Sequence, residues 1–482
     1  MVDASVPQAR YFLLREKNGV KYIKKTLLAF FLASLLFASA VCAASLLFAS
    51  AVCAFGIVLL RNGFSFTRKS GHTYYKEFHD HSFYRAVAYS KLPENNITIP
   101  KLRNRHIEHP PIENYRLVCY YSFPTQSCDL DKQLSYKKLD PDLCTHINIG
   151  FANIENNTIH LTDYYKNITR QVLMLKSHNK NLKVLLSVGG AGGSGFTEMV
   201  VNHANRKMFI KSILSYIKEF KLDGIDLDWE FPNANIYDSK ERMHFTQLLH
   251  EIREEINRQK KHKFLLTVAV ASPYFIAQNS YDISYMNDFV DFINLMTYDF
   301  HFYTKWTPFT GINSPLYSLP DDVGIFGTLT INYSANYWIS QGMSKNKINI
   351  GLPTYGHTYK LINPNNNGIS APAIGFGNLG HNGFIDYSEV CSFLIQSKIL
   401  PNFDDVSKSP YATYGQNWIS YDDIKSLSYK AEYIRQNNFG GAMVYSLNSD
   451  DYAGDCSQLE GNTIEKYPLI KQIKDILLDP EL

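Results

Sequence analysis

The sequence predicts an α/β fold, a TIM (β/α)8 barrel with a small α+β insertion domain between strands 7 and 8, preceded by an N-terminal transmembrane helix. Three observations predict it. Acidic and apolar side chains alternate over residues 223–230, as in a strand with one polar face. Short β-prone stretches alternate with helical patterns from about residue 115 to 478. An uncharged, mostly apolar run occupies residues 26–60.

The acidic stretch is the most informative part of the chain. As a strand, it carries Asp226, Asp228 and Glu230 on one face and apolar residues on the other. Three carboxylates in a dry core would be too costly, so this face must line a wet or reactive cavity. In a parallel barrel the last residues of a strand reach the mouth, and Glu230 is the last. From the strand alone, either a glycosidase acid or an oxygen-ligand site for Mg²⁺ or Ca²⁺ fits this pattern.

The remaining elements follow in chain order. The β-prone stretches predict strands at 115–121, 144–151, 183–187, 223–230, 264–271, 289–298, 348–352 and 441–446. Apolar periodicity predicts helices at 196–220 and 244–259, and another that begins at 171–178. The segment between the last two strands is too long for an ordinary loop, so it should hold additional structure.

The N-terminal region predicts the compartment. As one helix, residues 26–60 would span about 50 Å, enough to cross a bilayer with tilt. More basic residues precede this run than follow it, which places the N-terminus in the cytosol. We therefore expect a cytosolic tail (1–25), a signal anchor (26–60), a stem (61–112) and an extracellular or lumenal barrel (113–480). The alternative is a signal peptide cleaved near Ala43 or Ala54 and a secreted protein.

Composition excludes some classes of function. The chain has 482 residues, of which 45% are hydrophobic and 19% charged, as in a globular protein. Its formal net charge is only +3 and no basic stripe is present, so no nucleic-acid partner is expected.

The acidic stretch resembles the D-G-x-D-x-D-x-E signature of family 18 glycoside hydrolases, the chitinases and chitinase-like proteins. Other segments match that family in order: YRLVCY (115–120), LCTHINIGFA (143–152), SVGG (187–190), MTYDFH (296–301), GLPTYG (351–356) and GGAMVY (440–445). The resemblance covers about residues 115 to 478 and implies a small α+β domain at 356–424. Several ordered matches are more specific than one motif.

The resemblance also implies a reaction, substrate-assisted hydrolysis with retention of configuration, on chitin or chito-oligosaccharides. Glu230 would be the acid and later the base. Asp228 would hold the acetamide N–H, Asp226 would share a proton with Asp228, and Tyr298 would donate its hydroxyl to the acetamide oxygen. This chemistry needs neither a metal nor an organic cofactor.

Seven further residues would border the sugar subsite: Phe151, Gly190, Met296, Asp299, Trp306, Tyr355 and Tyr445. Ser187 and the glycines beside it are expected to serve close packing beneath the acids. The chain departs from the family pattern where tryptophans are usual, at Tyr445, Ala191 and near Pro124, and where an arginine is usual, at His357. These losses leave open an alternative, a catalytically weak lectin that binds chito-oligosaccharides at the cell surface.

Cysteines and sequons agree with a secretory route. By resemblance, Cys119 would pair with Cys144, and Cys391 with Cys456. Cys42 and Cys53 lie in the apolar run and Cys128 is left over outside it, so the protein is expected to be a monomer unless Cys128 links two chains. Four N-x-Ser/Thr sequons are candidate glycosylation sites: Asn96, Asn156, Asn167 and Asn332.

Overall fold

The computed structural model describes residues 115–125, 133–233, 240–259, 263–459 and 464–478. The predicted cytosolic tail, anchor and stem lie outside these described residues, as do Cys128 and Asn96. Within the described ranges, no helix is both long enough and apolar enough to cross a bilayer. The membrane anchor therefore stays a prediction.

Eight parallel strands form a closed barrel. They are β1 (Arg116–Ser122), β2 (His146–Glu155), β4 (Lys183–Gly189), β5 (Gly224–Asp228), β6 (Leu265–Ala271), β7 (Phe292–Met296), β8 (Ile348–Pro353) and β15 (Gly441–Tyr445). They pair in the order β1-β15-β8-β7-β6-β5-β4-β2, and β1 also pairs with β2, which closes the ring. A short strand, β3 (Thr158–His160), adds to β2 in antiparallel orientation. The predicted TIM barrel is confirmed.

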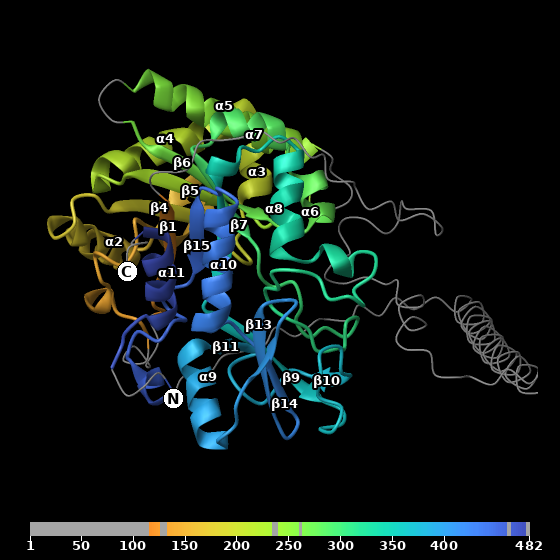
Figure 1. Ribbon diagram of the computed structural model, residues 1–482. Coiled ribbons are helices and arrows are strands. Elements are labelled where there is room, and N and C mark those ends of the chain that lie inside the picture. The colour runs from red at the N-terminus through yellow and green to blue at the C-terminus, as the bar shows by residue number, and fades with distance from the viewer. Residues whose placement is uncertain (1–114, 126–132, 234–239, 260–262, 460–463, 479–482) are drawn as a thin grey trace, which may run out of the picture. The chain divides into compact units, whose positions relative to one another are not determined.

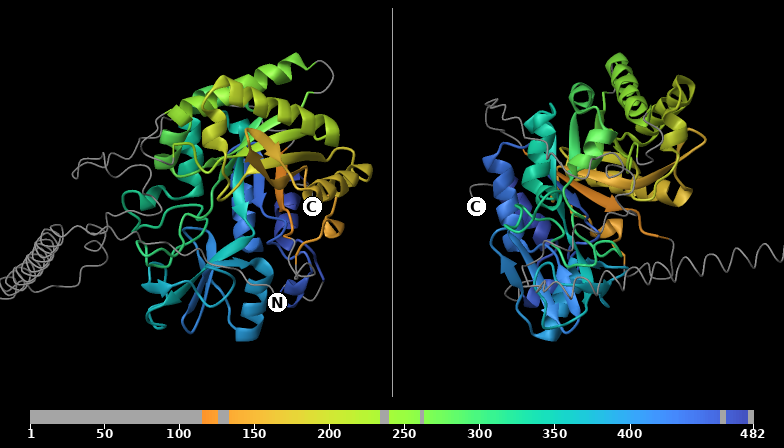
Figure 2. Two further views of the ribbon diagram at one scale, coloured as in Figure 1. Left: turned by 180° about the vertical axis from the view of Figure 1, so that it is seen from behind. Right: turned by 90° about the vertical axis from the view of Figure 1, so that its right-hand side faces the viewer.

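Helices cover the outside of the barrel (Figures 1 and 2). They are α2 (Asp163–Leu173), α3 (Phe196–Val200), α4 (His203–Phe220), α5 (Lys240–Arg258), α6 (Tyr274–Ser280), α7 (Ile283–Phe289), α8 (Ile331–Ser340), α10 (Ile424–Gln436) and α11 (Pro468–Leu478). In the described ranges, five 3₁₀ turns connect the helices and strands: η4 (Tyr136–Lys138), η5 (Met174–Ser177), η6 (Phe326–Thr328), η7 (Lys345–Lys347) and η8 (Asp455–Gln458).

All three predicted helices have different bounds in the structure, and the one expected at 244–259 is α5, Lys240–Arg258. The helix expected to begin at 171–178 starts at Asp163, because the Thr162 hydroxyl accepts the Tyr165 N–H (3.3 Å) and caps it there. The helix expected at 196–220 is divided into α3 and α4, because Asn202 leaves the helical conformation and its side chain accepts the Asn205 N–H (2.9 Å). A capping residue inside an apolar pattern therefore ended one helix and began another.

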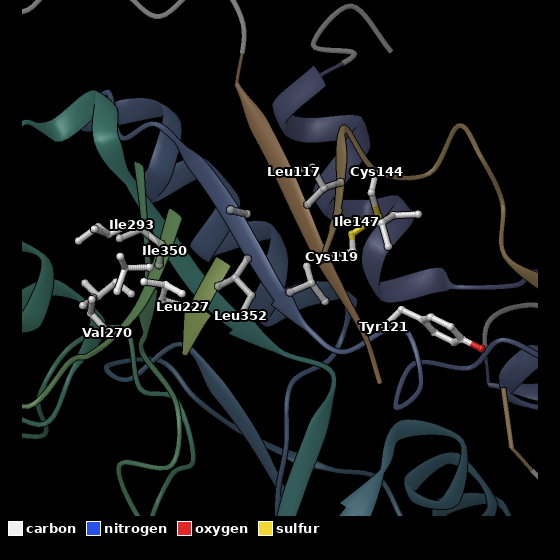
Figure 3. Close-up of a cluster of buried hydrophobic side chains, with 14 of the residues drawn as sticks. Leu117, Cys119, Tyr121, Cys144, Ile147, Leu227, Val270, Ile293, Ile350 and Leu352 are labelled. Atoms are coloured by element: carbon white, nitrogen blue, oxygen red, sulfur yellow. A yellow bond between two sulfur atoms is a disulfide. The ribbon is translucent and has the colours of Figure 1, made fainter. Parts of the chain in front are cut away.

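The strands bury two different faces. Figure 3 shows apolar side chains such as Leu117, Leu227, Ile293 and Leu352, which belong to the large core outside the strand ring. A smaller cluster, centred on Val118, Tyr120, Phe292 and Met443, packs with Phe151, Met296, Tyr298 and Tyr445. Leu117 and Val118 alternate along β1 between the two clusters, as the period of a strand requires.

The chain between β8 and α10 forms an antiparallel sheet and a helix. Its elements are β9 (Tyr355–Leu361), β10 (Ala373–Gly375), β11 (Phe384–Asp386), α9 (Tyr387–Ser397), β12 (Asn402–Asp404), β13 (Ser409–Tyr414) and β14 (Asn417–Ser420). The sheet order is β10-β9-β14-β13-β12, with β11 on β9 (Figure 1). The predicted insertion between the seventh and eighth barrel strands is confirmed.

Both disulfides implied by the family resemblance are present. Cys119 on β1 pairs with Cys144, which directly precedes β2, with Cα atoms 6.2 Å apart (Figure 3). Cys391 on α9 pairs with Cys456 in η8, with Cα atoms 5.3 Å apart. The first bridge ties two neighbouring barrel strands, and the second ties the insertion to the chain after β15.

Candidate active site

Strand β5 carries the acidic cluster from the barrel interior to its mouth. Asp226 is fully buried, Asp228 is 4% exposed, and Glu230 reaches solvent. The prediction that Glu230 is the last strand residue was wrong, because β5 ends at Asp228 and Glu230 lies two residues beyond it. The three carboxyl groups therefore have increasing access to water along the chain.

Asp226 is held by donors from four different strands. Its Oδ2 accepts hydrogen bonds from the hydroxyls of Tyr120 on β1 (2.7 Å) and Ser187 on β4 (2.7 Å). Its Oδ1 accepts one from the hydroxyl of Thr267 on β6 (2.5 Å) and a longer one from the amide of Asn294 on β7 (3.4 Å). Burial raises the pKa of Asp226, and these hydrogen bonds oppose the rise.

Asp228 has a different environment. Its Oδ1 is buried and has no hydrogen-bond partner among the residues that the structure describes. Burial, and then the charges of Glu230 and Asp226, raise the pKa of Asp228 well above its usual value. The described residues show no hydrogen bond between Asp226 and Asp228, so the predicted sharing of a proton stays a prediction. A buried, unpartnered carboxyl oxygen is available to a donor on a ligand.

Glu230 is suited to release a proton near neutral pH. Glu230 is exposed at the mouth, although protein atoms surround much of its carboxyl group. Burial, followed by the negative charge of Asp299, raises the pKa of Glu230 to about 7. A carboxylic acid with this pKa is still largely protonated in mildly acidic solution and can act as a general acid.

Aromatic side chains surround the acids at the mouth. The ring of Tyr445 lies 5.7 Å from that of Tyr120, 6.0 Å from Tyr298 and 6.2 Å from Tyr355, between centroids. Phe151 lies 6.1 Å from Tyr120. Met296 packs in the same interior cluster as Phe151, Tyr298 and Tyr445. The structure thus gathers most of the predicted subsite residues in one place.

Tyr298 directs a hydroxyl into this cluster. Its oxygen contacts the Met443 sulfur at 3.8 Å, which is a weak hydrogen bond. Burial raises the pKa of Tyr298 well above its usual value, and the nearby charge of Asp228 adds to the rise. Tyr298 therefore keeps its proton at physiological pH and can donate it in a hydrogen bond to a ligand.

Asp299 connects the barrel to the insertion. Its Oδ1 accepts the hydroxyl of Tyr355 (2.6 Å) and lies 2.7 Å from Nε2 of His357, and both partners belong to β9. Its backbone N–H donates to Asn313 Oδ1 (2.8 Å). Trp306, seven residues further along the chain, is 42% exposed.

Two glycines let β4 approach β5 closely. The N–H of Gly190 donates to the Asp228 carbonyl (2.9 Å), with a φ of +78°. A Cβ on Gly190 would lie 2.8 Å from the Phe151 ring, and one on Gly189 would lie 2.1 Å from the Asp228 carbonyl oxygen. The expectation of close packing agrees with this geometry. For Ser187 that expectation was incomplete, because its hydroxyl binds Asp226 directly.

Three residues of the site were missed in the sequence: Tyr120, Thr267 and Asn294 all bind Asp226. Strand parity was the available signal, since Tyr120 alternates with the outward-facing Cys119 and Tyr121.

The structure gives no support to the metal alternative. No group of three or more His, Cys, Asp or Glu residues in the described part of the chain is arranged to hold a metal ion. Both oxygens of Asp226 are bound by protein donors instead of facing an open site. The cluster is therefore better suited to proton transfer than to coordination.

Comparison with known proteins identifies the family. The model for "Glycosyl hydrolases family 18" matches residues 116–450. Chitinase-3-like protein 2 from Homo sapiens is 36% identical over 372 residues, which cover 75% of this chain and 92% of that protein. Chitotriosidase-1 from Mus musculus is 35% identical, covering 75% of this chain and 78% of that protein. An oviduct-specific glycoprotein from Papio anubis is 37% identical, and the match spans 60% of its length.

Solved structures agree. An immunomodulatory active chitinase from Trichuris suis superposes with a TM-score of 0.69 at 34% identity, covering 76% of this chain and 100% of that one. Human YKL-39, described as a pseudo-chitinase with retained chitooligosaccharide binding properties, gives a TM-score of 0.68 at 34% identity, covering 75% and 98%. The relatives thus include an active chitinase and a pseudo-chitinase. With its barrel, its insertion and its acidic strand, this chain belongs to glycosyl hydrolase family 18.

Proposed function

We propose that this protein is a glycoside hydrolase that cleaves β-1,4-linked N-acetylglucosamine polymers or oligomers by substrate-assisted, retaining hydrolysis. One observation carries the proposal: Glu230, whose pKa burial raises to about 7, lies two residues beyond a buried Asp228 whose Oδ1 has no partner among the described residues. A proton donor and an unused acceptor are the two groups that this reaction requires.

Each step can be assigned to a side chain. Glu230 gives its proton to the glycosidic oxygen as the bond to the anomeric carbon breaks. The acetamide oxygen of the same sugar attacks that carbon and forms an oxazolinium ion. Asp228 accepts the acetamide N–H, the negative charge that the Asp226–Asp228 pair retains stabilises the positive charge, and Tyr298 donates its hydroxyl to the acetamide oxygen. The Glu230 carboxylate then takes a proton from water. The water oxygen attacks the anomeric carbon and opens the oxazolinium ring, so the configuration at that carbon is retained.

A second candidate is a lectin that binds chito-oligosaccharides without efficient turnover. The observation that favours it is the absence of tryptophan at Tyr445, at Ala191 and near Pro124, where the family pattern has sugar-stacking rings. Each lost ring would remove about 1 kcal/mol of binding. YKL-39, the pseudo-chitinase, shows that such a protein exists in the family. The retained acid set of this chain favours the hydrolase.

Turnover of a fluorogenic chitotriose by the full chain decides between the two. We expect hydrolysis by the native protein, at least a thousandfold less by Glu230→Gln, and no change in Glu198→Gln, which removes an exposed carboxylate on α3. Binding of chitotriose without turnover by the native protein would favour the lectin. Equal turnover by the native protein and Glu230→Gln would contradict the assigned acid.

We also propose that the catalytic domain works outside the cytosol, anchored through residues 26–60 or secreted after cleavage. The two disulfides support this location, because such bridges persist in oxidising compartments. Protease treatment of intact cells would remove an anchored outer domain and spare a cytosolic one.

A further inference from the structure

A row of polar side chains crosses the barrel interior and ends at Asp226. Nε of Arg116 donates to Oδ1 of Asn349 (3.0 Å), and Nδ2 of Asn349 donates to Oδ1 of Asn294 (3.1 Å). Nδ2 of Asn294 is shared between Asp226 Oδ1 (3.4 Å) and the Tyr120 hydroxyl (3.3 Å). Tyr120 itself donates to Asp226 (2.7 Å), so the amide reaches the carboxylate directly and through the phenol.

The strand register brings these residues together. Asn294 on β7 lies opposite Asn349 on β8, and Asn349 lies opposite Gly441, which lies opposite Arg116 on β1. Both asparagines are fully buried. Because buried amides are costly unless they are hydrogen-bonded, apolar side chains of the same size would fill this layer at lower cost. Packing alone therefore does not explain the row.

The row has a single direction. Arginine has donors and no acceptor, so Asn349 must present its oxygen to Arg116 and its nitrogen to Asn294. Asn294 then presents its oxygen to Asn349 and must turn its nitrogen toward Asp226. The positive charge of Arg116 polarises both amides in the same sense, which strengthens the last donor. Each link thus favours the charged form of Asp226.

We propose that Arg116, Asn349 and Asn294 are positioning residues for hydrolysis, a network that fixes the Asp226 carboxylate and keeps it charged so that the proton of the acid pair resides on Asp228. The network lies beneath the reacting groups and touches no substrate. This inference rests on the proposed hydrolase function. Arg116, Asn349 and Asn294 would thus act from the barrel interior, away from the mouth.

Several other titrating groups lie near the row, among them Lys347, whose pKa is lowered mainly by burial and also by the charge of Arg116. Buried tyrosines face the acid pair and their pKa values are raised, to about 12 for Tyr445, so they stay neutral. Beside Arg116, burial lowers the pKa of His146 to about 3, so His146 is uncharged above pH 4, while Asp291 is an acidic neighbour. At the mouth, Asp299 with its partner His357 faces Glu230. These titrating groups remain in every variant that alters only Asn349.

The first test compares Asn349→Leu with Asn148→Leu. Asn148, on β2, is also fully buried, and neither of its amide atoms has a partner among the described residues. The acidic limb of the kcat/KM profile reports the first ionisation of the Asp226–Asp228 pair. In Asn349→Leu we expect this limb to move up by about one pH unit. Asn148→Leu should leave the limb in place, because Asn148 is outside the row.

The second test does not need activity. Without Asn349, the Asn294 amide is no longer held with its nitrogen toward Asp226, so the pKa of Asp226 in the folded state rises further. Because stability falls with pH between the unfolded and folded pKa values of an acid, Asn349→Leu should lose more melting temperature at pH 8 than at pH 5. A change in packing alone, as expected in Asn148→Leu, alters the melting temperature equally at both pH values.

Arg116→Met provides an independent variant if Asn349→Leu does not fold. It should shift both readouts in the same direction, and the double variant should add less than the sum of the two. The proposed network would be overturned if the acidic limb of kcat/KM stayed in place in these variants and their loss of melting temperature did not depend on pH. A native protein that binds but does not hydrolyse chitotriose would overturn the proposed function instead, and the pH dependence of melting would still decide whether the network controls Asp226.

Discussion

Gly190 lies where the end of β4, the backbone of β5 and the ring of Phe151 meet. Its φ of +78° is strained for other residues, and an added Cβ would lie 2.8 Å from the Phe151 ring. Gly190→Ala should therefore lose about 2–4 kcal/mol of unfolding free energy in urea titration, from backbone strain and overpacking together.

Gly192 is the matched control for that measurement. It has a similar φ of +76°, yet no atom lies within 4 Å of its built Cβ. Gly192→Ala should lose only the backbone contribution, about 1 kcal/mol. Equal losses in the two variants would show that contact with Phe151 costs nothing.

The charge of Asp299 should contribute to the pH at which kcat/KM falls on the basic side. Glu230 must be protonated to act, and its pKa is about 7, so kcat/KM should fall as pH rises through 7. Asp299→Asn removes one cause of that raised pKa and keeps an acceptor for Tyr355 and His357. The basic limb should move down by about half a pH unit.

An exposed carboxylate provides the control for this pH profile. The Asp163 side chain, at the start of α2, is fully exposed, and Asp163→Asn should leave the basic limb unchanged. His357→Arg, which would place a permanent cation on Asp299, should lower the basic limb as Asp299→Asn does. A basic limb that ignores Asp299 would mean that burial alone determines the Glu230 pKa.

Strand parity in one stretch was enough to predict that Asp226 and Asp228 share a face. The donors to Asp226 could not be predicted in this way. Tyr120 is 106 residues away and Asn294 is 68 residues away. Their role depends on the register between separate strands, which local sequence does not contain, and an inward tyrosine or asparagine otherwise resembles ordinary core packing.

At the scale of an element, helix α10 is attached to the insertion by a buried ion pair. Nζ of Lys430 contacts Oδ1 of Asp422, and both side chains are almost completely buried. Burial lowers the pKa of Lys430, and the Asp422 charge opposes this. Removing one partner leaves an uncompensated charge, so Lys430→Met should lose about 3–5 kcal/mol of unfolding free energy in guanidinium titration.

The double variant tests the cause of this loss. Asp422→Leu combined with Lys430→Met leaves no buried charge, and it should recover most of the stability. If the double variant were as unstable as the sum of the single variants, packing around these side chains would be responsible instead of charge.

The boundaries of elements were the least predictable level. Apolar periodicity continues through residues 196–220, yet Asn202 interrupts the helix and caps α4. Its side chain competes with the helical backbone for the Asn205 N–H, and that competition is decided by local geometry. Strand β5 ends before Glu230 because only residues through Asp228 have a paired neighbour on β6.

For the whole molecule, the barrel was predictable and the insertion was predictable only in part. Neighbours in a parallel barrel follow chain order, so ordered motifs were sufficient to place the eight barrel strands around the ring. In the insertion, β9 pairs with β14 and β10, an order that departs from the chain. Length indicated that a folded segment was present, but not how its strands pair.

The location of the whole molecule can be tested through its sequons. Asn156, in the turn between β2 and β3, and Asn167, on α2, are both exposed. Asn332 on α8 is half-buried, and its Oδ1 accepts the Tyr433 hydroxyl (3.0 Å). If the barrel folds in the secretory lumen, the accessible sequons should carry glycans, whereas the engaged amide of Asn332 should not.

Enzymatic removal of N-glycans, followed by gel electrophoresis, measures this. In a chain that also carries Asn96→Gln, deglycosylation should increase mobility, and Asn156→Gln with Asn167→Gln should abolish the shift. Asn332→Gln should leave it unchanged. Because glycans are added only on the lumenal side of the membrane, an unglycosylated chain from a eukaryotic host would contradict the outward orientation deduced from the basic residues before the apolar run. The two disulfides would then have to form in a reducing compartment, where they are rare.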